Sequence, residues 1–441
     1  MRTKFIKRGI LSFFIILFIT LMVLPGFYGK KSAFSAGDDT YKNLKLFNEI
    51  LDLIETNYVE DVDSNDIIDG AIKGMIKTLD PHSTYMTADT YKELKINTKG
   101  VFGGLGIEIT MINDIITVVS PIEDTPAYIA GVKSGDQIVG IDGKSTKGLT
   151  LEDAVHKLRG KAGTKVTITV MRKDLEKPTD FVITRAIIKL KSVKHKIYQK
   201  NIGYVRISSF QETTTDELRK AMSAITKKAT PLNGLILDLR NNPGGVLEQS
   251  IKVSDIFLKS GIIVSTKGRT KESETVYNAH DDGNEPLCPI VVLINGASAS
   301  ASEIVSGALQ DNGRAILLGT QTFGKASMQV VIPLNNGAAL KLTTGKYYTP
   351  SGKLIQAMGI SPDIEIEYLI PDKNRKKSRQ IREKDLKGHI AGENEKEGEG
   401  EEETSNNKSG ELKNDNQLSR AIDILKSWEI FNKMKKGQGN S

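Results

Sequence analysis

The stretch PIVVLINGASASASEIVSGALQDNGRAILLGTQTFGKASMQ, residues 289–329, decides the fold. Its apolar runs at 290–294 and 315–318 predict buried strands, and the segment 299–310 between them predicts a helix. A strand–helix–strand crossover makes its two strands parallel. Their carboxyl ends therefore lie at the same edge of a sheet.

Polar residues follow each of these two strands. Ser298 and Ser300 stand where the helix begins, and Lys325 stands just after the second strand. Open α/β sheets bind ligands at this edge. A serine needs an adjacent base to become a nucleophile, and a lysine can serve if burial lowers its pKa. Serines before a helix are also common N-caps and loop lysines are commonly solvated, so the spacing alone leaves the catalytic and the structural interpretations open.

A third strand, expected at 235–239, runs into the turn Asn241-Asn242-Pro243-Gly244-Gly245. If this strand is also parallel, the two glycines reach the same edge. Glycine backbone and the N–H groups at a helix N-terminus can stabilise a developing oxyanion. Nucleophile, base and oxyanion donors together predict acyl transfer, and hence amide or ester hydrolysis.

The whole chain predicts a multidomain α+β protein, since its 441 residues exceed one ordinary domain. Helical periodicity at 41–58 and 66–79 defines a helical N-terminal region. Short β-like runs split by glycine turns follow it, and alternating strands and helices come next, with an Asn336-Gly337 hairpin. The expected parts are 1–36, 40–98 (helical), 99–187 (β-rich), 188–370 (α/β core), 371–412 (a charged, disordered linker) and 413–436 (a terminal helix).

Composition excludes several classes of function. Cys288 is the single cysteine, so intramolecular disulfides and thiolate metal clusters are ruled out. The five histidines contain no HExxH pattern, and His82 is expected to have a structural role. A net charge of +7 with 6% aromatic residues argues against nucleic-acid binding. We expect no metal and no organic cofactor.

Residues 1–36 predict either a cleaved export signal or an uncleaved membrane anchor. The apolar stretch 9–24 follows four basic residues, Arg2, Lys4, Lys7 and Arg8. The small residues Ala33 and Ser35 have a spacing that suits cleavage, whereas extension through Phe27 and Tyr28 suits a membrane span. In both cases the rest of the chain is expected outside the cytoplasm, anchored to the cell membrane or secreted.

Four motifs resemble those of the C-terminal processing peptidases, also called tail-specific proteases. They are TLDPHS at 78–83, LDLRNNPGG at 237–245, the stretch at 289–329, and YYTPSG at 347–352. The resemblance covers about residues 40–370, and the closing helix near 416–428 is also similar. It implies an α/β serine peptidase core related to the crotonase and Clp-protease folds. The N-terminal and terminal helices are implied dimerisation elements, as in some relatives.

The resemblance also implies roles for individual residues of the core. Ser300 corresponds to the nucleophile, Lys325 to the base, and Gln329 to the residue that positions the lysine. The oxyanion donors correspond to the amide of Ala301 and to a glycine of the NPGG turn, with Gly244 and Gly245 both open. Asp311 corresponds to an acid with a structural role, and Ala326 departs from the glycine that most members carry there.

The segment 99–187 resembles a PDZ domain, through SGDQIVGIDG, LRGKAGT and the loop at 102–107. PDZ domains bind a free C-terminus as an added strand, with its carboxylate in a nest of loop N–H groups. The implied peptide-binding residues are Phe102, Gly103, Gly104, Leu105, Gly106 and Ile107. Arg159, at the end of the PDZ helix, either complements the helix dipole or couples peptide binding to the protease core.

Three other interpretations were weighed against an endopeptidase that recognises C-terminal tails. A trypsin-like protease with a trailing PDZ domain would need GNSGG ahead of the PDZ domain, and here Pro243 stands in the NNPGG turn of a later domain. A crotonase-fold acyl-CoA enzyme has no use for a PDZ domain or for the serine–lysine pairing. A catalytically silent PDZ adaptor at the membrane is separated from a protease only by activity.

Overall fold

The computed structural model describes residues 38–172, 177–369, 382–385, 388–390 and 415–438. The export signal or anchor predicted at 1–36 lies outside these residues, as does most of the predicted linker at 371–412. Within the described ranges, none of the helices has the length and apolar character needed to cross a bilayer. The chain divides into two compact units, residues 1–72 and 73–441.

The first unit contains helix α2 (Asp38–Asn57) and the start of α3 (Ser64–Lys77), close to the predicted helices. The apolar stripe of α2 is largely exposed, including Leu44, Phe47 and Ile50. This unit therefore presents an apolar helix surface.

A six-stranded sheet forms the centre of the second unit, in the order β10-β11-β12-β15-β16-β19. The edge strand β10 is antiparallel to β11, and all other neighbours are parallel. The parallel arrangement predicted from the crossover is confirmed. The strands are β10 (Val193–Tyr198), β11 (Ile202–Ile207), β12 (Gly234–Asp238), β15 (Ile290–Ile294), β16 (Ala315–Gly319) and β19 (Ile364–Glu365).

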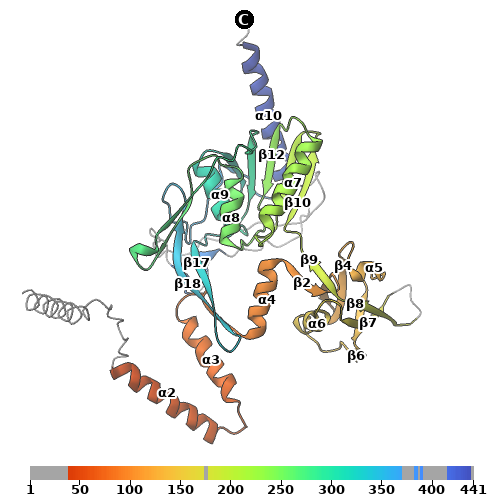
Figure 1. Ribbon diagram of the computed structural model, residues 1–441, viewed down its shortest axis with the longest axis vertical. Helices are drawn as coiled ribbons and strands as arrows, with labels where there is room; N and C mark the ends of the chain where they lie inside the picture. The colour runs from red at the N-terminus through yellow and green to blue at the C-terminus, as the bar shows by residue number, and fades with distance from the viewer. Residues whose placement is uncertain (1–37, 173–176, 370–381, 386–387, 391–414, 439–441) are drawn as a thin grey trace, which may run out of the picture. The chain divides into compact units, whose positions relative to one another are not determined.

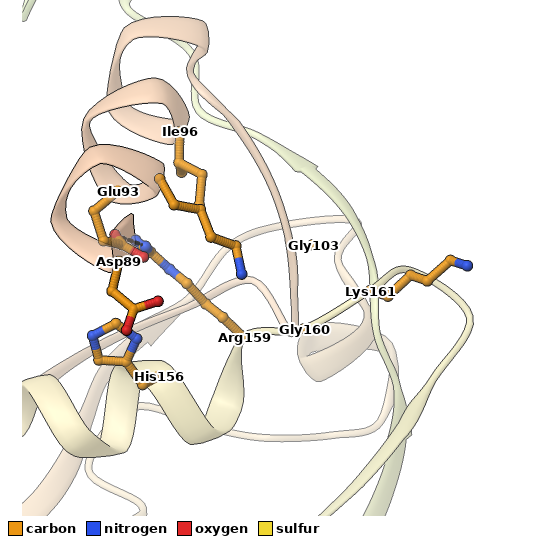
Figure 2. A pocket seen from close by; sticks show the side chains of 9 residues that line it. Asp89, Glu93, Ile96, Gly103, His156, Arg159, Gly160 and Lys161 are labelled. Carbon is orange, nitrogen blue, oxygen red and sulfur yellow. Dashed lines mark hydrogen bonds and ion pairs between the residues drawn. The ribbon is translucent and has the colours of Figure 1, made fainter. Parts of the chain in front are cut away.

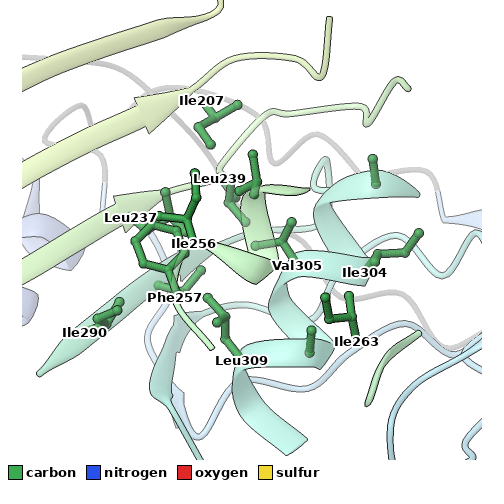
Figure 3. Packing of buried hydrophobic residues seen from close by; sticks show 14 of the residues in the cluster. Ile207, Leu237, Leu239, Ile256, Phe257, Ile263, Ile290, Ile304, Val305 and Leu309 are labelled. Atoms are coloured by element: carbon green, nitrogen blue, oxygen red, sulfur yellow. The ribbon is translucent and has the colours of Figure 1, made fainter. Parts of the chain in front are cut away.

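Helices α7 (Thr214–Lys228), α8 (Leu247–Asp255) and α9 (Ala301–Asp311) cover one face of this sheet (Figure 1). Val305 and Leu309 of α9 pack toward Leu237 of β12 and Phe257, as Figure 3 shows. Apolar residues on both faces of the strands explain why these strands read as continuous apolar runs.

The terminal helix α10 (Asn416–Gln438) covers the opposite face. Leu418, Ile422 and Leu425 are buried there against residues such as Ile236 and Val291. Gly234 allows this contact, since a Cβ at that position would lie 2.8 Å from the Leu425 side chain. Further along the helix, Trp428 and Phe431 are exposed, so the predicted apolar stripe is only partly covered.

A buried ionic network fixes the start of α10. The Arg240 guanidinium donates to Asp238 at 2.7 Å and to Asp415 at 2.8 Å, and also to Gln417 at 2.9 Å. Burial opposes ionisation of Asp238, but the hydrogen bonds and charge of Arg240 hold its pKa below the usual range. The end of β12 is thereby tied to the terminal helix.

A second sheet flanks the core. Strands β17 (Ser327–Pro333) and β18 (Ala339–Tyr348) form the hairpin predicted at Asn336-Gly337, and Gly337 has a φ of +83°. Beyond β18 lie β13 (Ile262–Gly268) and β14 (Thr275–Asn278).

One strand of this sheet comes from the region expected to be helical. Strand β1 (Thr84–Met86) pairs with β18. The carboxylate of Asp80 accepts the N–H groups of His82 and Ser83, which turns the chain after α3 and directs it into the sheet. Helix α4 (Ala88–Lys99) follows.

The β-rich segment contains the sheet β3-β4-β5-β7-β8, with β6 paired to β5, and a separate pair β2-β9. Helices α5 (Pro126–Ile129) and α6 (Leu151–Leu158) belong to the same segment. The strands are β2 (Val101–Gly104), β3 (Ile107–Ile112), β4 (Ile115–Pro121), β5 (Gln137–Ile141), β6 (Lys144–Ser145), β7 (Lys165–Met171), β8 (Thr179–Thr184) and β9 (Ala186–Lys189). Strand β3 is at an edge of its sheet.

Residues 382–385 lie within the linker that was predicted to be disordered, at 371–412, but they are ordered in the structure. Residues Glu383–Asp385 form a short 3₁₀ helix, η3, and the Glu383 side chain is fully buried. High charge density predicts disorder only where the charges can be solvated, and Glu383 is bonded inside the core instead.

We expect Leu425→Ala to lower the free energy of unfolding by about 2–5 kcal/mol, because it opens a cavity between α10 and the sheet. Denaturant unfolding followed by circular dichroism measures this. Ile430→Ala is the matched control, since Ile430 lies on the same helix and is exposed, and it should change stability by less than about 0.5 kcal/mol. Equal effects of the two substitutions would contradict the packing described for α10.

Candidate active site

The ends of three parallel strands deliver the predicted polar residues to one pocket of about 710 Å³. The NPGG turn follows β12, Ser300 follows β15, and Lys325 follows β16. The residues of interest among those lining it are Gly244, Gly245, Ser300, Ala301, Lys325, Gln329, Lys341 and Tyr347. The convergence predicted from the crossover topology is therefore present.

Ser300 occupies a strained turn between β15 and α9. Its φ is 57° and its ψ is −114°, a conformation that non-glycine residues rarely adopt. The turn places Ser300 in the pocket. Ser298 is different, because it is buried and its hydroxyl donates to the carbonyl oxygen of Leu239 at 2.8 Å. Of the two serines weighed from the sequence, Ser298 is structural and Ser300 faces the pocket.

A buried carboxylate that sequence reasoning missed joins the two polar loops. Glu303 Oε2 accepts the N–H of Ser300 at 2.8 Å and the N–H of Lys325 at 3.0 Å. Its Oε1 accepts the N–H of Gly324 at 2.7 Å and the hydroxyl of Thr322 at 2.6 Å. Burial raises the pKa of Glu303 to about 7, and these hydrogen bonds act against that rise.

The position of Glu303 in the sequence could have predicted one of its hydrogen bonds. It stands three residues after Ser300, where a capping-box acid reaches back to the N-cap amide. The capping interaction was thus predictable, whereas the bonds to the loop before Lys325 depend on tertiary structure.

Lys325 is a partly buried residue in this pocket. Burial, followed by the positive charge of Lys341, lowers the pKa of Lys325 to about 8, against the opposing effect of nearby carboxylates. About a tenth of the lysine is therefore neutral at pH 7, far more than for an ordinary lysine, and the neutral form is the one that a general base requires. The hydroxyl of Tyr347 donates to the carbonyl oxygen of Lys325 and also interacts with the Ser300 side chain.

The NPGG turn lies against the Ser300 turn. A Cβ on Gly244 would lie 2.8 Å from Ser300 Cβ, and one on Gly245 would lie 2.1 Å from the carbonyl oxygen of Phe210. Both positions also have positive φ, so glycine is required for its backbone conformation as well as for the space that a Cβ would need. The N–H of Gly244 donates to Asn242 Oδ1 at 2.9 Å inside the turn.

Two further predicted residues lie near Lys325. Gln329 lines the same pocket, and its side-chain nitrogen donates to Ser327 at 2.9 Å and to Thr343 at 3.2 Å. Ala326 is buried without a positive φ, so its departure from glycine brings no backbone strain.

Asp311 ends α9, away from the pocket lining. Its carboxylate accepts the N–H of Ser351 at 3.0 Å. Burial opposes ionisation, but hydrogen bonds from Thr349 and Ser351 lower the pKa of Asp311. It holds the TPSG turn, which agrees with the structural role expected for it.

The predicted peptide-binding residues lie along β2, the following turn and the edge strand β3. Leu105 is buried, and its carbonyl oxygen accepts the N–H of Ala127. Gly106 has a φ of +77°, and a Cβ there would lie 2.3 Å from Thr125. Helix α6 packs beside β3. An edge strand beside a helix is the arrangement by which PDZ domains add a peptide strand.

Arg159 ends α6 and contacts α4 rather than the sheets of the core. Its guanidinium forms an ion pair with Glu93 of α4, and it stacks 4.6 Å from the centroid of the Phe102 ring. Figure 2 shows Arg159 pointing toward Glu93. Leu94 and Asn97 of the same helix line the Ser300 pocket. Helix α4 thus touches both regions.

Comparisons with known proteins agree with this architecture. Family models match "Peptidase family S41" at residues 201–366, a PDZ domain at 103–181, and "Activating protease CtpB N-terminal domain" at 29–90. A carboxy-terminal-processing protease of Bartonella bacilliformis is 50% identical over 359 residues, 81% of this chain and 82% of the relative.

Two more relatives are similar. The carboxy-terminal processing protease CtpA of Bacillus subtilis is 37% identical over 376 residues, 83% of this chain and 78% of the relative. The solved structure of a photosystem II D1 C-terminal processing protease is 27% identical, with a TM-score of 0.44, and the match covers 74% of this chain and 94% of that one.

An α/β core of the S41 type, preceded by a PDZ domain and a helical N-terminal region, defines a serine-type peptidase. The chain belongs to the carboxy-terminal processing proteases of peptidase family S41. The fold class expected from the motifs is confirmed.

With Lys325 as the base, kcat/KM should rise as pH increases through about 8, because only the neutral amine accepts a proton. Lys341→Gln removes a positive charge that disfavours protonated Lys325. The pKa of Lys325 should then rise, which moves the midpoint to higher pH and lowers activity at pH 7 without changing the alkaline plateau.

The measurement is a pH profile of kcat/KM on a peptide substrate. Lys353→Gln serves as the control, since Lys353 is an exposed lysine outside the pocket lining. A midpoint that is the same in both variants would reject the influence of Lys341.

Proposed function

We propose that this protein is an endopeptidase in which Ser300 and Lys325 form a catalytic dyad and the PDZ domain selects substrates by their free C-terminal tails. The observation that carries the proposal is the shared pocket, in which a strained serine and a partly buried lysine of lowered pKa are joined through Glu303. Burial supplies the neutral base that a serine nucleophile requires.

In the proposed reaction, neutral Lys325 accepts the proton of the Ser300 hydroxyl as Oγ attacks the peptide carbonyl carbon. The resulting ammonium gives that proton to the leaving amine, and an acyl-enzyme remains. Water, deprotonated by the same lysine, then attacks the ester carbonyl carbon. The bond from that carbon to Ser300 Oγ breaks, and the lysine ammonium returns the proton to Oγ. One full cycle therefore consumes one water and cleaves one peptide bond.

The tetrahedral oxyanion needs fixed N–H donors. We assign them to Ala301 and to Gly245 of the NPGG turn. The N–H of Gly244 is already donated to Asn242, which favours Gly245 of the two glycines. Gln329 is retained as the residue that positions Lys325, and its bonds to Ser327 and Thr343 would anchor its amide beside the base.

Recognition and location complete the proposal. Substrates are proteins or peptides with free C-termini, which add to β3 while their carboxylate binds the 102–107 loop. The basic and apolar residues 1–36 would export the chain and either anchor it to the membrane or be cleaved. The exposed apolar side chains of α2 and of the far end of α10 support a homodimer.

The decisive experiment incubates the full-length protein with an unfolded model protein that ends in an apolar tail. We expect cleavage by the wild type, and loss of more than about 1,000-fold in kcat with Ser300→Ala and with Lys325→Ala. The same substrate with a C-terminal amide should be cut more slowly, because the tail carboxylate is lost. Retained activity in a folded Ser300→Ala or Lys325→Ala variant would reject the dyad, and peptide binding without any cleavage would indicate an adaptor.

We further propose that Arg159 couples peptide binding to catalysis through Glu93 and α4. Arg159→Ala should leave peptide affinity unchanged and lower turnover roughly 5- to 150-fold, the usual range of a coupling free energy of 1–3 kcal/mol. Fluorescence anisotropy and steady-state kinetics separate the two quantities. Lys157→Ala, an exposed change on α6, should alter neither. Unchanged turnover in Arg159→Ala would leave Arg159 with only its helix-end role.

A further inference from the structure

Residues 382–385 enter the core from the charged segment between β19 and α10. Glu383 lies in the short 3₁₀ helix η3, and its side chain is fully buried. Glutamate is almost never fully buried unless it is paired. The surroundings of Glu383 should therefore explain why a carboxylate occupies this place.

Two side chains bind the Glu383 carboxylate. Its Oε1 accepts the amide N–H of Gln356 at 2.8 Å and lies 2.6 Å from Nε2 of His82. His82 belongs to the TLDPHS motif near the N-terminus, 301 residues away in the sequence. Glu383 thus joins a residue after α3 to the loop after β18.

Glu383 is connected to the loop that carries Lys325 through Gln356 and through its own backbone. Gln356 Oε1 accepts the N–H of Ala326, the residue after Lys325, at 2.7 Å. On the other side, the N–H of Glu383 donates to the carbonyl oxygen of Phe323 at 3.2 Å. The loop is therefore held two residues before the lysine and immediately after it.

A neighbouring residue of the same segment adds a third attachment. The guanidinium of Arg382 donates to Gln321 Oε1 at 3.0 Å. By contrast, the side chain of Lys384 is exposed. The attachments therefore come from particular residues of the segment rather than from its charge as a whole.

We propose that Glu383 is a positioning residue for Lys325: its buried carboxylate holds the lysine loop through Gln356, and His82 fixes the carboxylate. This inference rests on the proposed role of Lys325 as the base. Residues 382–385, which lie in the chain between the catalytic core and the terminal helix, therefore help to hold the active site in shape.

The charges around Lys325 give the proposal a distinctive signature. Lys341 disfavours the protonated lysine, whereas Glu383, Glu303 and Asp80 favour it. Removing the charge of Glu383 should therefore lower the pKa of Lys325. The midpoint of the pH profile would then move to lower pH, the opposite direction from that expected for Lys341→Gln.

The test compares three variants of the full-length protein by pH profiles, kcat and KM on a peptide substrate. Glu383→Gln keeps an acceptor oxygen for Gln356 and loses the charge, so kcat at high pH should stay near wild type while the midpoint moves to lower pH. Glu383→Ala loses both, and kcat should fall roughly 100-fold with KM little changed, as expected for a displaced base. Lys384→Ala is the matched control and should behave as wild type.

Hydrogen exchange of the peptide that contains Ala326 provides a readout that does not depend on activity. Glu383→Ala should lower its protection, and Lys384→Ala should not. A Glu383→Ala variant with wild-type kcat, or a Glu383→Gln variant with an unmoved pH midpoint, would overturn the inference. If the Glu383→Ala variant does not fold, the pH midpoint of the Glu383→Gln variant alone tests the inference.

The failure of this inference is distinguishable from the failure of the proposed dyad. An active, folded Lys325→Ala variant would reject the dyad itself. Inactive Lys325→Ala together with Glu383 variants that match wild type in kcat, pH midpoint and exchange would reject only the role of Glu383.

Discussion

The carboxylate of Glu303 is the interaction on which the active site depends. It is buried, and it accepts hydrogen bonds from the backbone of both the Ser300 turn and the Lys325 loop. These loops follow different strands, so the parallel sheet alone brings them to the same edge without fixing their relative orientation. The single Glu303 carboxylate, with its four hydrogen-bond donors, supplies that orientation. One of those donors is the backbone N–H of Ser300, and this hydrogen bond offsets part of the strain in the Ser300 backbone.

The cost of burying Glu303 shapes its surroundings. An isolated carboxylate in the core would be neutralised, and the raised pKa of Glu303 reflects that tendency. Backbone N–H groups oppose it without bringing a counter-charge into the site. A cationic partner at this place would have competed for the carboxylate with the backbone N–H groups of the two loops that Glu303 joins.

The sequence predicted the local elements and the edge of the sheet well, because apolar runs and the crossover rule determine them. The strands at 290–294 and 315–319 and the helix between them are examples. It did not predict β1, which pairs with a strand more than 250 residues away, nor the burial of Glu383. Both depend on partners distant in the chain, and the dense charge around Glu383 pointed instead to a solvated segment. The spacing alone did not separate Ser298 from Ser300; the motif resemblance pointed to Ser300, and the surroundings of the two side chains agree with it.

The place of α10 in the chain has a consequence for how the protein is made. The face of the central sheet that contains Ile236 and Val291 is covered by Leu418, Ile422 and Leu425, which follow every strand of that sheet in the chain. Until these three residues have been synthesised, the strands, which are apolar on both faces of the sheet, are covered by helices on one face only. The core is therefore completed only once α10 has been synthesised, and a product truncated before α10 would expose an apolar, aggregation-prone sheet face rather than form a smaller working enzyme.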